Sequence, residues 1–305
     1  MTQATLLLPP RTRLSGALSA GVGRALARAD VRSVEPGEQA QLHRHFQLVP
    51  DRWAPAALTR QRDAKDAAGA LWLRADPAYM APDMNGARML AHGEALALQA
   101  DECQALLRTL KPLFGDAGML LDAPVPSRWY LRLTPGTPLP DFTPPHLAVG
   151  DDLFAHLPAG DAGRRWRALF NEAQILLHAH PANAARQAAG KAAVNGLWFW
   201  GAGTLPDAVR TTHAQVKSRE DLLSALAHAA GATDPSAQGS VLVDLRHLTS
   251  TEMLCGEALQ PLLDELAKGA LTGLALDFAD GRLAQLQHAQ RWRFWRRPLQ
   301  DLQAL

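Results

Sequence analysis

The chain is poor in features that would mark a specialised class of protein. Its 305 residues include only two cysteines, and the formal net charge is +1. Cys103 and Cys255 fall in segments with helical spacing and have no histidine close by, so we expect two reduced core thiols rather than a disulfide or a metal site. The near-neutral charge disfavours a dedicated binder of nucleic acid.

The sequence also lacks a long apolar segment. No stretch reaches the ~18 apolar residues that a membrane-spanning helix needs. The short apolar run 6–8 ends at Pro9-Pro10 and has no basic segment before it, so it does not resemble a secretory signal. We therefore expect a cytoplasmic protein without a membrane partner. Apolar residues still make up 47% of the chain, which is enough for a substantial core.

No internal repeat is present, but strand and helix patterns alternate in both outer thirds of the chain. This alternation predicts an α/β fold, a mainly parallel sheet with helices on both faces. Asp280-Gly281 predicts a hairpin after the last long strand. The strands expected here are 4–8, 240–245, 273–278 and 282–287, and the helices are 16–29, 52–68, 218–230 and 251–268.

The middle of the chain has a different composition. Prolines are dense between 134 and 146, and hairpin-like strand signals precede them. We expect an α/β core made of residues 1–69 and 204–305, with 70–203 forming an inserted α+β subdomain. Its expected strands are 70–74, 118–121, 128–133 and 194–200, and its expected helices are 101–113, 161–179 and 181–189.

The strongest local signal for chemistry lies between 171 and 203. Asn183 and Arg186 are three apart on a helix and so share a face, where Arg186 can clamp a phosphate or carboxylate. The strand that follows ends in glycines, and backbone N–H groups of a tight turn there can face an anion. The candidate ligand-binding residues are Arg128, Asn171, Asn183, Arg186, Asn195, Trp198, Trp200, Gly201 and Gly203. The same residues also suit a structural role, since asparagines lock loops and paired tryptophans fill cores.

The segment HPANAARQAAGKAAVNGLWFWGAG, residues 180–203, resembles the part of archaeal-type cofactor-independent phosphoglycerate mutases that carries the pattern N…R…G…NxxWxWGxG. Most of 70–300 is still more similar to RpfE-type regulatory proteins, through pieces such as Leu73-Arg74-Ala75-Asp76-Pro77. The resemblance implies a reduced alkaline-phosphatase-like fold. It also implies two divalent metals held by Asp and His, and a Ser or Thr that takes the phosphoryl group.

The sequence departs from that family where the metals would bind. The mutases follow their first strand with Asp-Gly, whereas Pro9-Pro10-Arg11 stands here, and their Asp-His pair near the C-terminus is replaced by Asp280-Gly281. None of the eleven histidines adjoins an aspartate. We therefore predict no metal, no cofactor and a catalytically degenerate protein that regulates or binds a small phosphorylated or carboxylate ligand. The alternative is an active metal-dependent phosphoglycerate mutase or phosphatase with an atypical metal set, so whether the chain is an enzyme stays open.

Residues 291–298, RWRFWRRP, combine arginines with aromatic side chains. Alternation would place Trp292 and Phe294 on one face of a half-buried edge strand. The alternative is a docking surface for a protein partner. A stacking surface for nucleic acid is the interpretation that the overall charge disfavours.

Overall fold

The computed structural model describes residues 2–84 and 86–305 and divides into two compact units. Unit 1 is Met1–Val49 with Ala208–Leu305, and unit 2 is Pro50–Asp207. This division differs from the expected boundaries chiefly at helix α3 (Pro55–Ala64). We expected α3 in the core, but its Ala56 and Ala57 pack with Trp72 and Tyr130 of unit 2.

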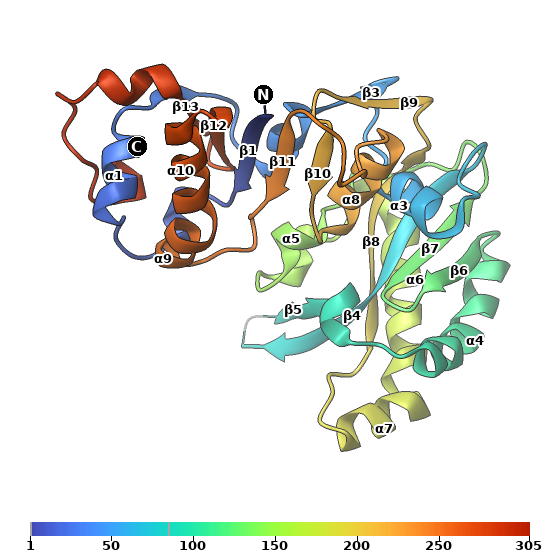
Figure 1. Ribbon diagram of the computed structural model, residues 1–305. Coiled ribbons are helices and arrows are strands. Elements are labelled where there is room, and N and C mark those ends of the chain that lie inside the picture. The colour runs from blue at the N-terminus through green and yellow to red at the C-terminus, as the bar shows by residue number, and fades with distance from the viewer. Residues whose placement is uncertain (1, 85) are drawn as a thin grey trace. The chain divides into compact units, whose positions relative to one another are not determined.

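Unit 1 is built on a six-stranded sheet (Figure 1). Its order is β10 (Gln215–Lys217), β11 (Val241–Asp244), β1 (Thr2–Leu8), β12 (Leu271–Phe278), β13 (Arg282–Gln287) and β2 (Asp30–Ser33). The first four strands are parallel, whereas β13 and β2 are antiparallel. The expected mainly parallel sheet is thus confirmed for β10, β11, β1 and β12, and not for the other edge of the sheet. The Asp280-Gly281 hairpin is confirmed, since Gly281 N–H donates to the Phe278 carbonyl.

The core of unit 1 lies against one face of this sheet. Leu6 and Leu8 of β1 and Leu274 and Leu276 of β12 pack there with Val22 of α1. The unit's other elements are α1 (Ala20–Leu26), α2 (Glu38–His43), α8 (Asp221–Ala229), α9 (Thr251–Met253), α10 (Gln260–Lys268) and the small antiparallel pair β3 (Phe46–Val49) and β9 (Ala208–Thr211). The helix expected at 251–268 has the expected length, but it contains a π-helical stretch, Leu254–Leu259, just before Pro261. π-Helical turns are rare and occur mostly as single turns within α-helices.

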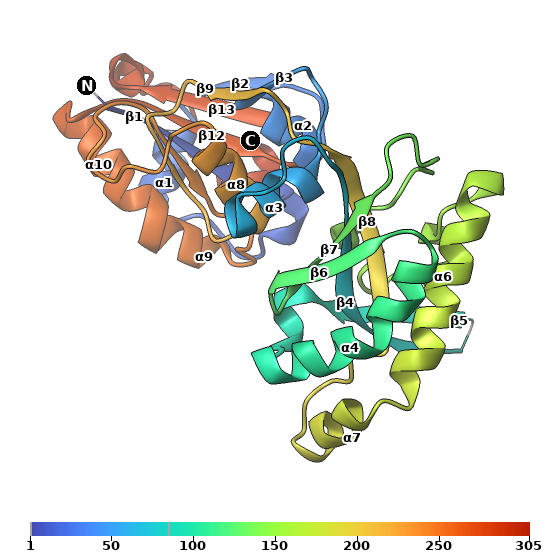
Figure 2. The ribbon, with the colours of Figure 1, turned by 90° about the vertical axis from the view of Figure 1, so that its right-hand side faces the viewer.

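Unit 2 is an antiparallel sheet with helices, the α+β arrangement expected for the middle of the chain. The order is β5 (Gly86–His92), β4 (Leu71–Asp83), β7 (Arg128–Leu133) and β6 (Leu120–Val125), and β8 (Gly196–Thr204) pairs with β4. The helices besides α3 are α4 (Ala100–Asp116), α5 (Pro145–Ala148), α6 (Gly160–His178) and α7 (Pro181–Ala188). Figure 2 shows α4 and α6 over one face of this sheet.

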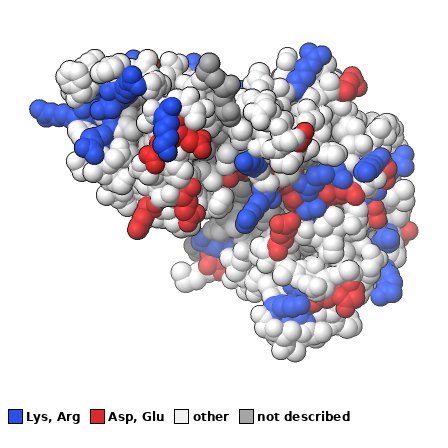
Figure 3. Space-filling view, viewed as in Figure 1, with Lys and Arg blue, Asp and Glu red and all other residues white. Residues whose placement is uncertain are grey.

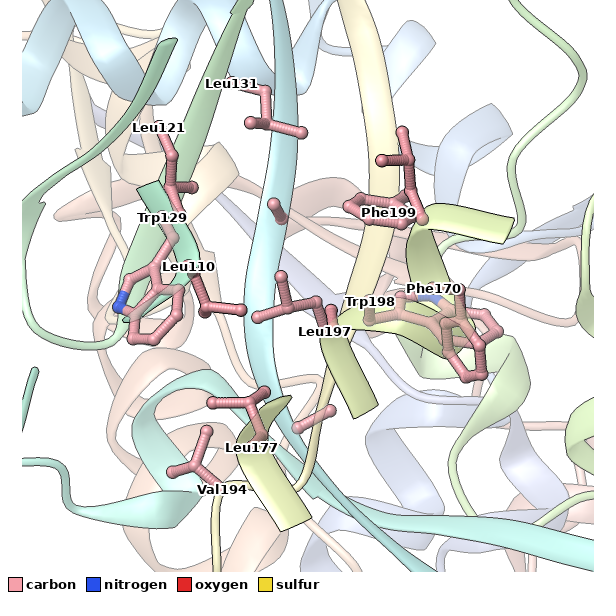
Figure 4. Packing of buried hydrophobic residues seen from close by; sticks show 14 of the residues in the cluster. Leu110, Leu121, Trp129, Leu131, Phe170, Leu177, Val194, Leu197, Trp198 and Phe199 are labelled. Atoms are coloured by element: carbon pink, nitrogen blue, oxygen red, sulfur yellow. The ribbon is translucent and has the colours of Figure 1, made fainter. Parts of the chain in front are cut away.

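The core of unit 2 lies between the sheet and these two helices. Leu110 of α4, Phe170 and Leu177 of α6, and Trp129 of β7 converge there (Figure 4). The predicted core thiols are confirmed, because Cys103 and Cys255 are both free and buried. Burial raises the pKa of the Cys103 thiol to about 11, which leaves it un-ionised at neutral pH.

Two expected elements are wrong in extent or type. The strand expected to end before Asp76-Pro77 continues to Asp83, because Asp76 is neutralised inside the sheet rather than exposed at a turn. The edge strand expected at 291–298 is absent. Its first two residues belong to the short 3-10 helix His288–Trp292. That helix begins with a capping box formed by Gln287 and Gln290, which turns the chain out of β13.

Candidate functional site

Two aspartates lie at the carboxyl end of the parallel strands of unit 1. Asp244 of β11 and Asp277 of β12 are both in register with Leu7 of β1, one on each side. Residues in register on neighbouring strands point to the same face, so the two carboxylates share a face and are separated by a strand, roughly 10 Å apart at the ~4.8 Å spacing of strands. Open α/β sheets bind their ligands outside this edge. The edge is therefore the candidate functional site.

Asp277 is fully buried and has two basic partners. Arg44 Nη2 lies 2.6 Å from Oδ1 and Arg44 Nε 2.9 Å from Oδ2, while His45 Nε2 lies 2.9 Å from Oδ2. Gln41 of α2 anchors the same segment by donating to the backbone carbonyls of Leu8 and Asp277. Burial raises the pKa of the Asp277 carboxyl, but His45 and Arg44 outweigh it, so the pKa is lowered and the group is ionised at neutral pH.

A hydrogen-bonded chain runs on from Asp277. His45 Nδ1 lies 3.1 Å from His213 Nε2, and His213 Nδ1 lies 2.9 Å from Ser240 Oγ. Ionised Asp277 can only accept, so His45 Nε2 donates to it. If His45 is neutral, His213 Nε2 donates to His45 Nδ1, and Ser240 Oγ donates to His213 Nδ1. If His45 is protonated, His45 Nδ1 donates to His213 Nε2, and His213 Nδ1 donates to Ser240 Oγ. His213 is neutral in both cases.

His213 is held neutral by its surroundings. Burial, and to a smaller extent the charge of His45, together lower the pKa of His213 to about 4. The four residues therefore form an ordered polar network inside unit 1.

Both carboxylate oxygens of Asp244 also accept hydrogen bonds from side chains. Arg246 Nε lies 2.8 Å from Oδ1 and Nη2 lies 2.9 Å from Oδ2, and Ser218 Oγ donates to Oδ2 over 2.7 Å. Burial raises the pKa of the Asp244 carboxyl, but Arg246 and Ser218 outweigh it and the pKa is lowered. Glu38 and Glu220 lie 3.8 and 3.5 Å from the Arg246 guanidinium, so this arginine is shared among three carboxylates.

These aspartates do not fit the two-metal site that the family resemblance implies. Within the described residues no group of three or more His, Cys, Asp or Glu side chains could hold an ion. Each carboxylate at the edge already accepts from a guanidinium, and Leu7 between them supplies no ligand atom. Two metals that act together must lie a few ångströms apart on shared ligands. The metal-free state of the protein nevertheless stays a prediction.

A cavity of about 570 Å³ lies between two segments that come after β1 and β11 in the chain, 15–19 and 250–260. Its volume falls within the ~300–1,000 Å³ of small-molecule sites. Three serine hydroxyls line it, together with a single charged group, Glu252. Ser250 also caps the helix that starts at Thr251, where its hydroxyl accepts from the Met253 N–H. The lining is Ser15, Gly16, Ala17, Leu18, Ser19, Ser250, Glu252, Cys255, Gly256 and Gln260.

The residues predicted from sequence lie in unit 2. Arg186 is buried, and its nitrogens donate to the Ala192 carbonyl (2.9 Å), the Glu102 carboxylate (2.7 Å) and the Leu96 carbonyl (2.6 Å). Asn183 bonds the backbone of Leu177 and Val194. The structure gives both residues a role in fastening the α6–α7–β8 connection. Their predicted role in ligand binding stays a prediction.

The remaining predicted residues are not brought into one place. Asn195 bonds both backbone groups of Met80, and Asn171 is exposed on α6. Trp198 Nε1 donates to the Thr143 carbonyl. Arg128 Nε lies 2.7 Å from Asp63 Oδ2, a carboxylate that Tyr130 also contacts at 2.6 Å. The side chains of Asn195, Trp198 and Arg128 therefore each have a partner within the protein.

The expected glycine turn after Trp200 is wrong. β8 continues to Thr204, and Gly201 and Ala202 form a bulge opposite Leu73 of β4. Gly201 has φ +67°, and a Cβ there would lie 2.9 Å from Pro55 Cβ. The glycines thus let the start of α3 approach bare backbone, and they do not form an anion-binding turn.

Gly201→Ala should therefore destabilise the protein more than Gly190→Ala. Both glycines have a left-handed backbone, at φ +67° and +70°, but only Gly201 has a neighbour within reach of a Cβ. We expect a loss of about 1 kcal/mol at Gly190 and about 2 kcal/mol or more at Gly201. Urea denaturation of the two variants measures this, and equal losses would contradict the close approach of α3.

The sequence interpretation missed a buried ion pair in unit 2. Arg74 and Asp76 of β4 are both buried and form a two-pronged pair at 2.8 and 2.9 Å, and Trp200 Nε1 donates to Asp76 over 2.7 Å. The Arg74 guanidinium lies 5.3 and 5.2 Å from the ring centres of Tyr130 and Trp200. The i, i+2 spacing of Arg74 and Asp76 in a strand is the signal that could have found the pair.

No family model matches the chain. A stretch of 63 residues, 21% of the chain, is 38% identical to a probable 2,3-bisphosphoglycerate-independent phosphoglycerate mutase of Geobacter sulfurreducens and covers 16% of that protein. Another of 94 residues, 29% of the chain, is 35% identical to the corresponding mutase of Methanothrix thermoacetophila and covers 24% of it. The chain is distantly similar to the cofactor-independent phosphoglycerate mutases. Similarity to RpfE-type regulators stays a prediction.

Two solved structures align with most of this chain. A cofactor-independent phosphoglycerate mutase from Thermoplasma acidophilum superposes with a TM-score of 0.42 and 14% identity over 94% of this chain and 89% of that one. The PH0037 protein from Pyrococcus horikoshii gives 0.48 and 13% over 93% and 87%. The sequence matches span less than a quarter of the curated relatives. None of the helices in the described part of the chain is long and apolar enough to span a bilayer.

Proposed function

We propose that this chain is a phosphoglycerate-mutase-like protein that does not perform two-metal phosphoryl transfer. It acts instead as a regulatory protein that binds a small phosphorylated or carboxylate ligand. The observation that carries the proposal is the state of the carboxyl edge of unit 1, where Arg44 and Arg246 neutralise Asp277 and Asp244. A dication would have to displace a guanidinium from each buried carboxylate, which costs several kcal/mol.

The ligand site that fits this proposal is the cavity between segments 15–19 and 250–260. Hydroxyl groups are donors that suit an anion, and three serines line this hollow of ligand size. The negative charge of Glu252, which also lines the cavity, repels an anion. Glu252→Gln should therefore strengthen binding of an anion, whereas it would weaken binding of a cation.

The test combines metal analysis, a mutase assay and titration with 3-phosphoglycerate on the purified chain. We expect less than one equivalent of Mn²⁺ or Zn²⁺, no interconversion of phosphoglycerates, and saturable binding. Gly256→Phe should weaken that binding at least tenfold, since Gly256 lines the cavity with open space around it. Gly115→Phe, at a helical glycine of α4 with equally open surroundings, is the matched control.

Two results would overturn the proposal. Stoichiometric metal together with turnover would establish the alternative, an active mutase or phosphatase with an atypical metal set. Absence of 3-phosphoglycerate binding, or binding that neither Gly256→Phe nor Glu252→Gln alters, would remove the cavity as an anion site.

A further inference from the structure

Three large aromatic side chains stand exposed near the end of the chain. Trp292, Phe294 and Trp295 are 65%, 78% and 68% exposed. Tryptophans elsewhere, such as Trp129 and Trp166, are almost fully buried. An aromatic side chain buries roughly 150–250 Å² when it is covered, so these three leave a large apolar area in water. Contiguous exposure of this kind marks an interaction site more often than scattered surface residues do.

The segment that bears these side chains is fixed to unit 1. Arg293 Nη1 donates to Asp30 Oδ1 over 2.5 Å, and Gln290 Nε2 donates to Asp30 Oδ2 over 2.8 Å. Further on, Leu299 N–H donates to the Gly23 carbonyl, and Leu302 lies in the core. The aromatic side chains are therefore held on an anchored stretch of backbone, which lowers the entropy that a partner's binding would cost.

The charge around the aromatic side chains is positive. Arg293 is balanced by Asp30, but Arg291, Arg296 and Arg297 are exposed, and the described carboxylates form no ion pair with these three. Figure 3 shows Lys and Arg gathered at the end of unit 1 where Figure 1 draws the red C-terminal segment. We call Arg291, Trp292, Phe294, Trp295, Arg296 and Arg297 the aromatic–arginine surface.

We propose that the aromatic–arginine surface is the docking site for an acidic segment of a partner protein that also carries apolar side chains. Tryptophan and arginine are the residues most enriched among those that dominate binding energy in protein interfaces. The positive charge selects an acidic partner and speeds its approach. This inference is independent of the proposed ligand site.

The arrangement of the rings favours a protein partner over single-stranded nucleic acid. The Arg291 guanidinium lies 4.9 Å from the centre of the Trp292 ring and covers one of its faces. Phe294 and Trp295 meet edge to face, with centroids 5.7 Å apart and an angle of 77°. Stacked bases need parallel, open ring faces, whereas apolar side chains fit between rings at an angle.

The test is selection of a random dodecapeptide phage library on the full chain. Clones that also bind the variant Trp292→Ala/Trp295→Ala are discarded. Deleting 291–305 is not a suitable variant, because Leu302 and Leu305 belong to the core of unit 1. We expect the selected peptides to be rich in Asp and Glu with at least one Leu or aromatic residue. Their affinity should fall at least tenfold in Arg296→Glu/Arg297→Glu and stay unchanged in Phe154→Ala, an exposed aromatic in unit 2.

The same titrations are run with oligo-dT of twenty nucleotides and with phosphatidylserine vesicles. Selection of neutral or basic peptides, or no selection above background, would overturn the proposal. So would tighter binding of oligo-dT or vesicles than of the best peptide, if the two-tryptophan variant abolishes it. Circular dichroism melts of the variants should match wild type, because every substituted side chain is exposed.

Discussion

Replacing Arg74 with Met, or Asp76 with Leu, should lower the free energy of unfolding by about 3–5 kcal/mol. Either change leaves one buried charge without its partner, and such a charge is costly to keep out of water. Asp76 is fully buried, and its carboxylate also accepts from Trp200, so its removal breaks a network rather than one contact. Chemical denaturation followed by circular dichroism measures the loss.

The double variant Arg74→Met/Asp76→Leu tests how much of each single loss comes from the charge that is left unpaired. Because both charges are then gone, we expect it to be more stable than the sum of the two single losses predicts. Arg164→Ala is the control, since its pair with Asp161 is exposed on α6 and should contribute far less. If the loss of unfolding free energy in the double variant equals the sum of the two single losses, the Arg74–Asp76 pair does not stabilise this part of unit 2.

Local pattern was sufficient to predict much of the fold. The apolar spacing around Trp166, Leu169 and Phe170 predicts α6 almost to its ends, because a helix that covers a sheet must present one continuous apolar stripe. The Asp280-Gly281 hairpin follows from turn chemistry that needs no distant partner. In both cases the determinants lie within a few residues of the element.

The two errors in unit 2 have different origins. β4 continues through Pro77 with Asp76 paired to Arg74, a contact that the i, i+2 spacing of the two residues could have predicted. The bulge at Gly201 lies against Pro55, far away in the sequence, and no spacing rule shows that contact.

The same holds for the candidate site. His45, His213, Ser240 and Asp277 come from four separate segments of unit 1. The one local signal was Asp277, a charged residue within the apolar strand LTGLALDF. A buried carboxylate needs basic partners, so that position alone predicts that an Arg or His must reach it, without telling which one.

His213 gives the site a measurable pH dependence. Its pKa is lowered to about 4 in the folded protein, from an ordinary value near 6.5. Since the unfolded chain binds this proton more readily, the stabilising contribution is complete above pH ~6.5 and is lost as the pH falls towards 4. At 1.36 kcal/mol per pKa unit, the loss from pH 7.5 to 4.5 is about 2–3 kcal/mol. Carboxylates with lowered pKa, such as Asp277, lose their contribution only at more acidic pH.

His213→Gln should therefore flatten the dependence of unfolding free energy on pH between 7.5 and 4.5. Glutamine keeps a donor for His45 and an acceptor for Ser240 but binds no proton. Urea denaturation at pH 7.5, 5.5 and 4.5 compares this variant with wild type and with His228→Gln, a change at an exposed histidine of α8. The His228 variant should follow the wild-type slope. If His213→Gln also follows it, the proton is not excluded from His213 in the folded protein, and the ordered network between Asp277 and Ser240 does not exist in the form described.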